Sequence, residues 1–283
     1  MISIAQHLDP EDIFAEIRME RQAHRGAFLL LEGITDIRRF SKFLVEDCST
    51  VNCWGKPKLL RVLELVDHYD FAGALALADA DFDRFTNDLQ HSANLIYSET
   101  HDFDLDCIRS GAFFAYLEEA GDHEKIAALG GAQAVLEFVL EALHPISCAR
   151  LCNRRGVITC SLSDLEWDPC YSPFKVNRGM YAAKALKKTG LTREAVEAML
   201  SVMAAEEEEN HDLWQITNGH DFCVALGISL REALGSRGKQ QTTGQEVEMH
   251  LRLVYQFHHF DTGAVAAAIR EWEAQSETFR ILQ

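Results

Sequence analysis

Three acidic residues directly follow two apolar segments of the sequence, at points where β-strands are expected to end. Glu32 follows the run AFLLL, and both Asp79 and Asp81 come just after the run GALALA. In an open α/β sheet, the carboxyl ends of the strands form the crevice in which ligands bind. Carboxylates that share a crevice repel one another unless a cation neutralises them, and hard oxygen ligands suit Mg²⁺ or Mn²⁺. These residues therefore predict a divalent-metal site.

Two local features of the sequence favour the convergence of these three side chains. Asp79 and Asp81 are two residues apart, so on an extended backbone they point to the same side. Gly33 permits a tight turn between the strand and the following helix, which lets Glu32 face the crevice.

The aspartate pair Asp79 and Asp81 has other possible functions and a purely structural interpretation. An EF-hand calcium loop that starts at Asp79 requires Gly at its sixth position and Glu at its twelfth, where the chain has Arg84 and Gln90. The haloacid-dehalogenase-like phosphatases also use D-x-D after a strand, but on their first strand, whereas this pair follows the third expected strand. A purely structural interpretation stays open, because Asp readily caps helices.

Short apolar runs alternate with helical patterns in the first part of the chain, which predicts βαβ units and a mostly parallel sheet. The expected elements are helix 11–24, strand 27–31, helix 35–45, strand 50–54, helix 57–68, strand 73–78 and strand 93–97. Helical patterns then dominate, at 107–120, 123–143, 178–188, 192–208, 218–235, 245–257 and 263–275, with a loop-rich stretch at 156–176. We predict an α/β module over 1–110 and a mainly helical domain over 111–283.

The charge balance excludes a generic binder of polyanions. The chain of 283 residues has 27 basic and 44 acidic side chains, a formal net charge of −17. Any nucleic acid must therefore bind at a local site. The basic clusters Arg38–Arg39, Arg154–Arg155 and Lys184–Lys188 are candidates for contacts with a phosphate backbone.

The compartment is inferred from what the sequence does not contain. No uncharged apolar run reaches the roughly 20 residues that span a bilayer, and no secretory signal opens the chain. We therefore expect a cytoplasmic protein with no membrane association. The sequence has eight cysteines but no C-x-x-C motif, so buried thiols are favoured over a zinc knuckle for the cluster Cys148, Cys152, Cys160 and Cys170.

The acidic motifs resemble those of a Toprim domain, a Rossmann-like fold with a mostly parallel sheet flanked by helices. Toprim domains carry E-G-x-x-D after the first strand and D-x-D after the third, matched here by Glu32–Asp36 (EGITD) and Asp79–Asp81 (DAD). Gly55–Lys56, Thr100–Asp104 and Gly219–Asp221 resemble one branch of stand-alone Toprim proteins. That branch is related to the overcoming-lysogenisation-defect nucleases and includes the Toprim effector of the PARIS anti-phage system.

The resemblance implies a metal-dependent nuclease. A topoisomerase would need a tyrosine nucleophile and a longer chain, and a primase would need zinc-binding and helicase-docking parts. By resemblance, we expect the toxic effector of an anti-phage defence system, which acts on host RNA such as tRNA and is restrained by an ATPase partner of the ABC or AAA type. We also expect a homodimer in the active state. A DNA endonuclease of the same fold and a non-catalytic Mg²⁺-binding interaction module stay open as alternatives.

The resemblance also implies roles for individual residues. Asp79 and Asp81 are expected to hold a Mg²⁺ or Mn²⁺ ion, with Glu32 as a further ligand or as the general base. Asp83 or Asp104 would help to hold a second ion. The family pattern has Glu where this chain has Asp104, so the chain departs from the pattern there.

The remaining polar residues have two interpretations each. Lys56 could stabilise the developing phosphorane charge, or it could be a solvated lysine in a turn. Asp36 could tether the turn or hydrogen-bond a ligand. His220 could be oriented by Asp221 for proton transfer, or the pair could simply start a helix.

Overall fold

The computed structural model describes residues 8–162, 165–235, 237–276 and 278–283, which form two compact units. The first unit comprises the described residues up to Ala80 together with Leu89–Glu99 and Gln256–Gln283. The second comprises Asp81–Asp88 and Thr100–Tyr255. These units differ from the predicted domains 1–110 and 111–283, chiefly because the C-terminal segment packs with the α/β part.

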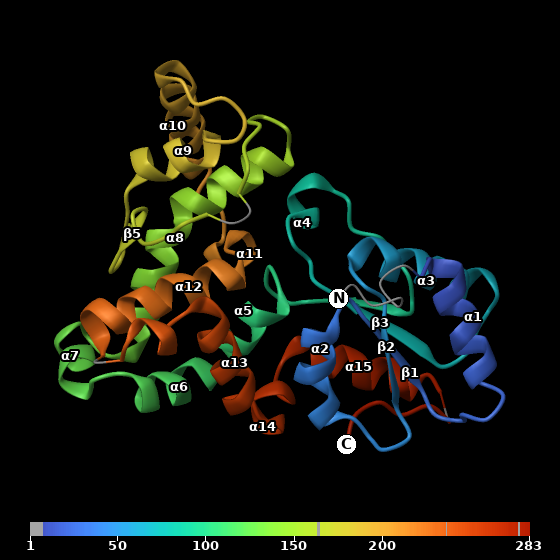
Figure 1. Ribbon diagram of the computed structural model, residues 1–283. Coiled ribbons are helices and arrows are strands. Elements are labelled where there is room, and N and C mark those ends of the chain that lie inside the picture. The colour runs from blue at the N-terminus through green and yellow to red at the C-terminus, as the bar shows by residue number, and fades with distance from the viewer. Residues whose placement is uncertain (1–7, 163–164, 236, 277) are drawn as a thin grey trace. The chain divides into compact units, whose positions relative to one another are not determined.

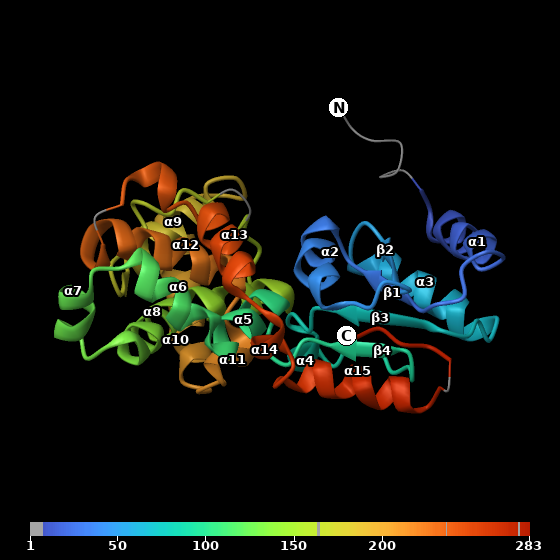
Figure 2. The same cartoon turned by 90° about the horizontal axis from the view of Figure 1, so that it is seen from below.

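The first unit is a four-stranded parallel sheet flanked by helices, as the alternating pattern predicts (Figure 2). The strand order is β2-β1-β3-β4, and every neighbouring pair is parallel. The strands are β1 (Phe28–Leu31), β2 (Ser49–Asn52), β3 (Ala74–Ala78) and β4 (Leu95–Tyr97). The helices are α1 (Pro10–Glu20), α2 (Ile34–Phe40), α3 (Lys56–His68), α14 (Phe257–Phe260) and α15 (Ala264–Ala274), with a 3-10 turn at Ser41–Phe43.

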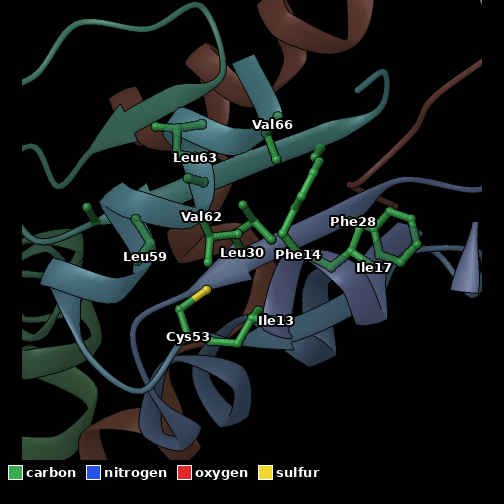
Figure 3. Close-up of a cluster of buried hydrophobic side chains, with 13 residues drawn as sticks. Ile13, Phe14, Ile17, Phe28, Leu30, Cys53, Leu59, Val62, Leu63 and Val66 are labelled. Atoms are coloured by element: carbon green, nitrogen blue, oxygen red, sulfur yellow. The ribbon is translucent and has the colours of Figure 1, made fainter. Parts of the chain in front are cut away.

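The two central strands are apolar along their whole length because helices cover both of their faces. Every residue of β1 and β3 is buried. On one face, Phe28 and Leu30 of β1 pack against α1 and α3 in a single hydrophobic cluster (Figure 3). The α1 and α3 side chains of this cluster are Ile13, Phe14, Ile17, Leu59, Val62, Leu63 and Val66.

The C-terminal segment belongs to the α/β unit through side-chain and backbone contacts. Helix α15 contacts β4, and Phe260 stacks on Phe43 with ring centroids 4.8 Å apart. The buried Glu273 carboxylate accepts hydrogen bonds from the backbone N–H groups of Ile281 and Leu282, at 2.6 and 2.8 Å. Leu282 also forms an antiparallel bridge with Leu44. These contacts explain why residues 256–283 join the sheet.

The second unit is helical, as predicted, apart from one short hairpin (Figure 1). Its helices are α4 (Asp83–Thr86), α5 (Phe103–Cys107), α6 (Phe113–Ala120), α7 (His123–Ala128), α8 (Ala132–Arg154), α9 (Arg178–Leu186), α10 (Arg193–Glu207), α11 (Leu213–Ile216), α12 (Gly219–Ser229) and α13 (Gly244–Val254). The hairpin strands are β5 (Tyr171–Ser172) and β6 (Lys175–Val176); π-helical turns lie at Ile108–Ala112 and Leu230–Leu234, and a 3-10 turn lies at Lys239–Gln241. No described helix combines the length and apolar character that crossing a bilayer requires.

The cysteines of the chain are free thiols, and most of them are buried. All eight are free, and all except the half-buried Cys48 are buried. Burial raises the pKa of Cys148 to about 12 and that of Cys152 to about 11. Both thiols are therefore protonated at neutral pH, whereas the thiolate is the form that attacks electrophiles and binds metals. The expectation of buried thiols is confirmed for the whole cluster, Cys148, Cys152, Cys160 and Cys170.

Candidate functional site

Two of the predicted acidic residues lie at the same edge of the sheet, at the ends of its two central strands. β1 and β3 are hydrogen-bonded neighbours in a register that pairs Leu31 with Leu77. Glu32 directly follows β1, and Asp79 directly follows β3. Since neighbouring strands lie about 4.8 Å apart, the topology alone brings these two residues close together.

A hydrogen bond joins the two residues directly. The backbone N–H of Asp79 donates to Oε1 of Glu32 at 2.9 Å, across a sequence separation of 47 residues. The next N–H, that of Ala80, donates to Oγ of Ser98 at 2.9 Å, and Ser98 is fully buried just after β4. The side chains of Glu32 and Ser98, which follow β1 and β4, therefore hold the backbone at Asp79 and Ala80 in place.

The turn between β2 and α3 is the second structure that supports Glu32. Trp54 and Gly55 both have left-handed backbone conformations, with φ of 59° and 112°. The N–H of Gly55 donates to the backbone carbonyl of Glu32 at 2.7 Å. A left-handed conformation is unfavourable for a bulky residue such as Trp54, and strain of this kind is common at functional sites.

Lys56 is the first residue of α3 and reaches the same edge of the sheet. Its Nζ lies 3.5 Å from the carbonyl oxygen of Ala80, the residue after Asp79. The ammonium group also lies over the ring of Tyr97, 5.7 Å from the centroid. Lys56 is half-buried, and its ammonium group lies beside the backbone that directly follows Asp79.

In the turn after β1, Gly33 does not act as predicted, whereas Asp36 takes the first of its two predicted roles. Gly33 is extended, with φ of −156°, a conformation that any residue adopts, so the freedom of glycine is not what makes the turn. Asp36 accepts the N–H of Gly33 at 3.2 Å and forms an ion pair of 3.0 Å with Arg39, which is only 2% exposed. Asp36 therefore tethers the turn, and Arg39 is too buried to contact a nucleic-acid backbone.

Asp81 does not follow Asp79 on an extended backbone. β3 ends at Ala78, and Asp81 has a left-handed φ of 49°. The N–H of Asp81 donates to the carbonyl of His101 at 2.7 Å in the second unit. The predicted alternation of side chains therefore stops before Asp81, because the strand ends first.

Asp83 has a charged partner within the second unit. It is the first residue of α4, is 6% exposed, and lies 3.1 Å from Nη2 of Arg154. Arg154 also pairs with Asp88 at 3.2 Å. A metal ion would have to compete with Arg154 for the Asp83 carboxylate.

Asp104 lies in the first turn of α5, beside a residue that the sequence analysis missed. Asp102 caps α5 through the N–H of Leu105 at 2.9 Å, and it also accepts the N–H of Gly219 at 2.7 Å. A Cβ added at Gly219 would lie 2.4 Å from Oδ1 of Asp102 and 2.7 Å from Cβ of Asp104. The motifs Thr100–Asp104 and Gly219–Asp221 therefore meet in space, and Gly219 is required for that close approach.

Arg150 is the second residue that the sequence analysis missed. Its guanidinium group binds the Asp221 carboxylate through Nε and Nη2, the latter at 2.6 Å, and Asp221 is 2% exposed. Burial opposes the charge of Arg150, but the pairing with Asp221 outweighs it and raises the Arg150 pKa. Asp221 is thus hydrogen-bonded to Arg150 and not to His220.

His220 pairs instead with Glu248 of α13. Its Nδ1 is hydrogen-bonded to Glu248, and this bond raises the pKa of the imidazole although burial opposes the charge. His220 and Asp221, at the start of α12, therefore each lie in an ion pair.

The other predicted basic clusters are largely neutralised within the second unit. Arg155 lies 2.7 Å from Glu206, and Lys184 pairs with Glu166. Together with Arg154, these cations are already matched by carboxylates, so they supply less positive potential to nucleic acid than their sequence clustering predicts.

Within the part of the chain that the structure describes, no group of three or more His, Cys, Asp or Glu side chains is arranged to hold a metal ion. The candidate site of the first unit consists instead of the Glu32 carboxylate, the backbone of Asp79 that is hydrogen-bonded to it, and the Lys56 ammonium beside the carbonyl of Ala80. Neither a protein-family model nor a curated protein matches this sequence.

Proposed function

We propose that the chain is a Mg²⁺-dependent nuclease that hydrolyses phosphodiester bonds at the carboxyl edge of β1 and β3. One observation carries the proposal: Glu32 and Asp79, 47 residues apart, are joined by a hydrogen bond at the ends of neighbouring parallel strands. This edge is where open α/β sheets bind ligands. The position of Lys56 beside Ala80 adds a cation at the same edge.

The donor set of the first unit suits Mg²⁺. This ion is commonly bound through one or two carboxylates, while water and substrate phosphate fill its other positions. Glu32 and Asp79 meet that requirement without a third carboxylate. Mn²⁺ takes the same hard oxygen donors. The contributions of Asp81, Asp83 and Asp104 to metal binding stay predictions.

Each residue at this edge has a distinct proposed role. Asp79 would hold the metal ion, and Glu32 would either join it as a ligand or take the proton of the attacking water. The Lys56 ammonium would stabilise negative charge that develops on the scissile phosphate. When bound, Mg²⁺ supplies Lewis acidity and a water of lowered pKa.

The biological setting follows from the resemblance to stand-alone Toprim proteins. The segments Glu32–Asp36 and Asp79–Asp81 support the proposal of an anti-phage effector. On that basis we infer host RNA such as tRNA as the substrate, an ABC-type or AAA ATPase as the restraining partner, and a homodimer as the active form.

The proposal is tested by incubating the purified chain with total cellular RNA and, separately, with plasmid DNA, in Mg²⁺ or in excess EDTA. We expect RNA to be cleaved in Mg²⁺ and left intact in EDTA, because the carboxylates alone supply no strong electrophile. The test variant is Asp79→Asn, which keeps the backbone N–H that is bonded to Glu32 but removes one negative charge proposed to bind the metal ion. This variant should cleave far more slowly.

Other outcomes of this assay would point to a different function or substrate. Metal-dependent cleavage of DNA alone would replace the RNA substrate by DNA. Cleavage that persists in EDTA would refute the metal dependence. If neither nucleic acid is cut in Mg²⁺ or Mn²⁺, with or without the ATPase partner, the edge of the sheet is a non-catalytic Mg²⁺-binding module.

A further inference from the structure

The second unit contains a cavity of about 570 Å³, a size typical of small-molecule sites. It lies among α8, the loop residues Leu162, Leu165 and Trp167, and the first turns of α12 and α13. Polar groups come from the helices and apolar groups chiefly from the loop. None of the residues assigned above to nucleic-acid cleavage lines it.

On the polar side of this cavity, the side-chain oxygens of Asp221, Asn218 and Thr243 already accept hydrogen bonds. Both oxygens of Asp221 accept from Arg150. Oδ1 of Asn218 accepts the N–H of Asp221 at 3.2 Å and thereby caps α12. Oγ1 of Thr243 accepts the N–H of Glu246, also at 3.2 Å, and caps α13.

Several donors of the same residues are left over. Arg150 uses Nε and Nη2 for Asp221, so Nη1 has no acceptor among the described residues. His220 donates through Nδ1 to Glu248, and this bond raises the pKa of the imidazole and so favours the imidazolium form, in which Nε2 is also a donor. The backbone N–H groups of Gly244 and Gln245 begin α13 and likewise have no acceptor in the described chain. With these acceptors engaged and these donors available, the cavity favours a ligand that accepts hydrogen bonds, and convergent donors of this kind suit an oxyanion.

The rest of the lining favours an anion that is attached to a flat apolar body. Trp167 lines the cavity with Leu162, Leu165 and Val224. The indole is half-buried and lies against the ring of Tyr171 in an edge-to-face arrangement, with centroids 6.3 Å apart. Aromatic side chains of this kind stack on nucleobases with little regard to base identity.

We propose that this cavity binds a nucleoside monophosphate, with the phosphate on the donors of Arg150, His220, Gly244 and Gln245 and the base against Trp167. The Asp221 carboxylate does not repel the phosphate strongly, because Arg150 pairs with both of its oxygens. Gly244 has a second role, since a Cβ at this position would lie 2.5 Å from Cγ2 of Val224. The absence of a Cβ at Gly244 thus permits the close packing of α12 and α13 beside the cavity.

The test is calorimetric titration of the full chain with adenosine 5′-monophosphate and, separately, with inorganic phosphate. EDTA is present throughout, so that neither probe can bind through a metal ion at the edge of β1 and β3. We expect a dissociation constant of about 1 mM or below for the nucleotide, and binding of inorganic phosphate that is weaker by about tenfold because the stacking on Trp167 is lost.

Two variants separate the phosphate contacts from the base contact. His220→Gln should weaken both probes by about tenfold, since a charge-assisted hydrogen bond is removed. Trp167→Leu should weaken the nucleotide by about tenfold and leave inorganic phosphate unchanged. The matched control is His123→Gln, because His123 also faces a carboxylate, Glu118 at 3.7 Å, but lies outside the cavity.

Three results would overturn the assignment. The first is no binding of the nucleotide at concentrations up to about 10 mM. The second is equal affinity for both probes, which would make the cavity a simple anion site. The third is nucleotide binding that neither His220→Gln nor Trp167→Leu changes, which would locate the nucleotide elsewhere on the chain.

Discussion

Replacing Glu32 by glutamine is expected to lower the rate of Mg²⁺-dependent RNA cleavage by about 10²- to 10⁴-fold, the range that a general base contributes. The variant should nevertheless fold normally. A carboxamide oxygen can still accept the N–H of Asp79, which is the contact that the Glu32 carboxylate makes across the sheet. The loss of rate would therefore reflect the missing negative charge and not a rearranged strand end.

The measurement is a single-turnover cleavage assay combined with thermal unfolding of the same preparations. Glu16→Gln is the matched control, because Glu16 is an exposed glutamate on α1 of the same unit. This control should retain the wild-type rate. Wild-type cleavage by Glu32→Gln with an unchanged melting temperature would remove Glu32 from the chemistry.

Replacing Arg150 by alanine is expected to destabilise the second unit by about 3–5 kcal/mol, the usual cost of leaving one member of a buried ion pair without its partner. The Asp221 side chain is only 2% exposed, so its charge is poorly solvated once the guanidinium is gone. The free energy of unfolding is obtained from urea denaturation followed by circular dichroism.

Two further variants identify the cause. In the double variant Arg150→Met with Asp221→Leu, both charges are removed together, so the loss should be clearly smaller. Arg193→Ala is the matched control, because the pair Arg193–Glu197 is 87% and 62% exposed and should change stability by no more than about 0.5 kcal/mol. A loss for Arg150→Ala no larger than that of the control would mean that Asp221 is not held as a buried charge.

The α/β part of the fold could be predicted because its strands are short, apolar and separated by helical patterns. The expected strand at 73–78 is observed as Ala74–Ala78, and the expected helix at 57–68 as Lys56–His68. A strand that is buried on both faces has to be apolar throughout, so its end is marked by the first charged residue. For this reason Glu32 and Asp79 could be located from sequence.

The interior of the long central helices could not be predicted in the same way. The pattern at 123–143 is divided by Gly130 and Gly131, whose φ values of 101° and 96° end α7. Helix α8 then continues through Pro145 to Arg154, although a proline inside a helix removes a hydrogen bond at a cost of about 3 kcal/mol. Pro145 is buried, and the packing of α8 against α10 and α12 outweighs the local preference.

The partners of the charged side chains also could not be predicted from the sequence. Arg150 meets Asp221 across 71 residues, and Asp102 meets Gly219 across 117. No local spacing encodes such pairs, because they depend on how the helices of the second unit pack. The cavity beside Arg150 arises from the same packing and had no signal in the sequence.

A metal-dependent nuclease requires a divalent ion at the edge of β1 and β3, and anomalous diffraction from crystals soaked in MnCl₂ tests whether an ion binds there. We predict a manganese peak roughly 2–2.3 Å from a carboxylate oxygen of Asp79, with Glu32 either as a further ligand or beside a water bound to the ion. A difference map without a peak at this edge, or with manganese bound only elsewhere on the chain, would contradict the proposed metal-dependent nuclease.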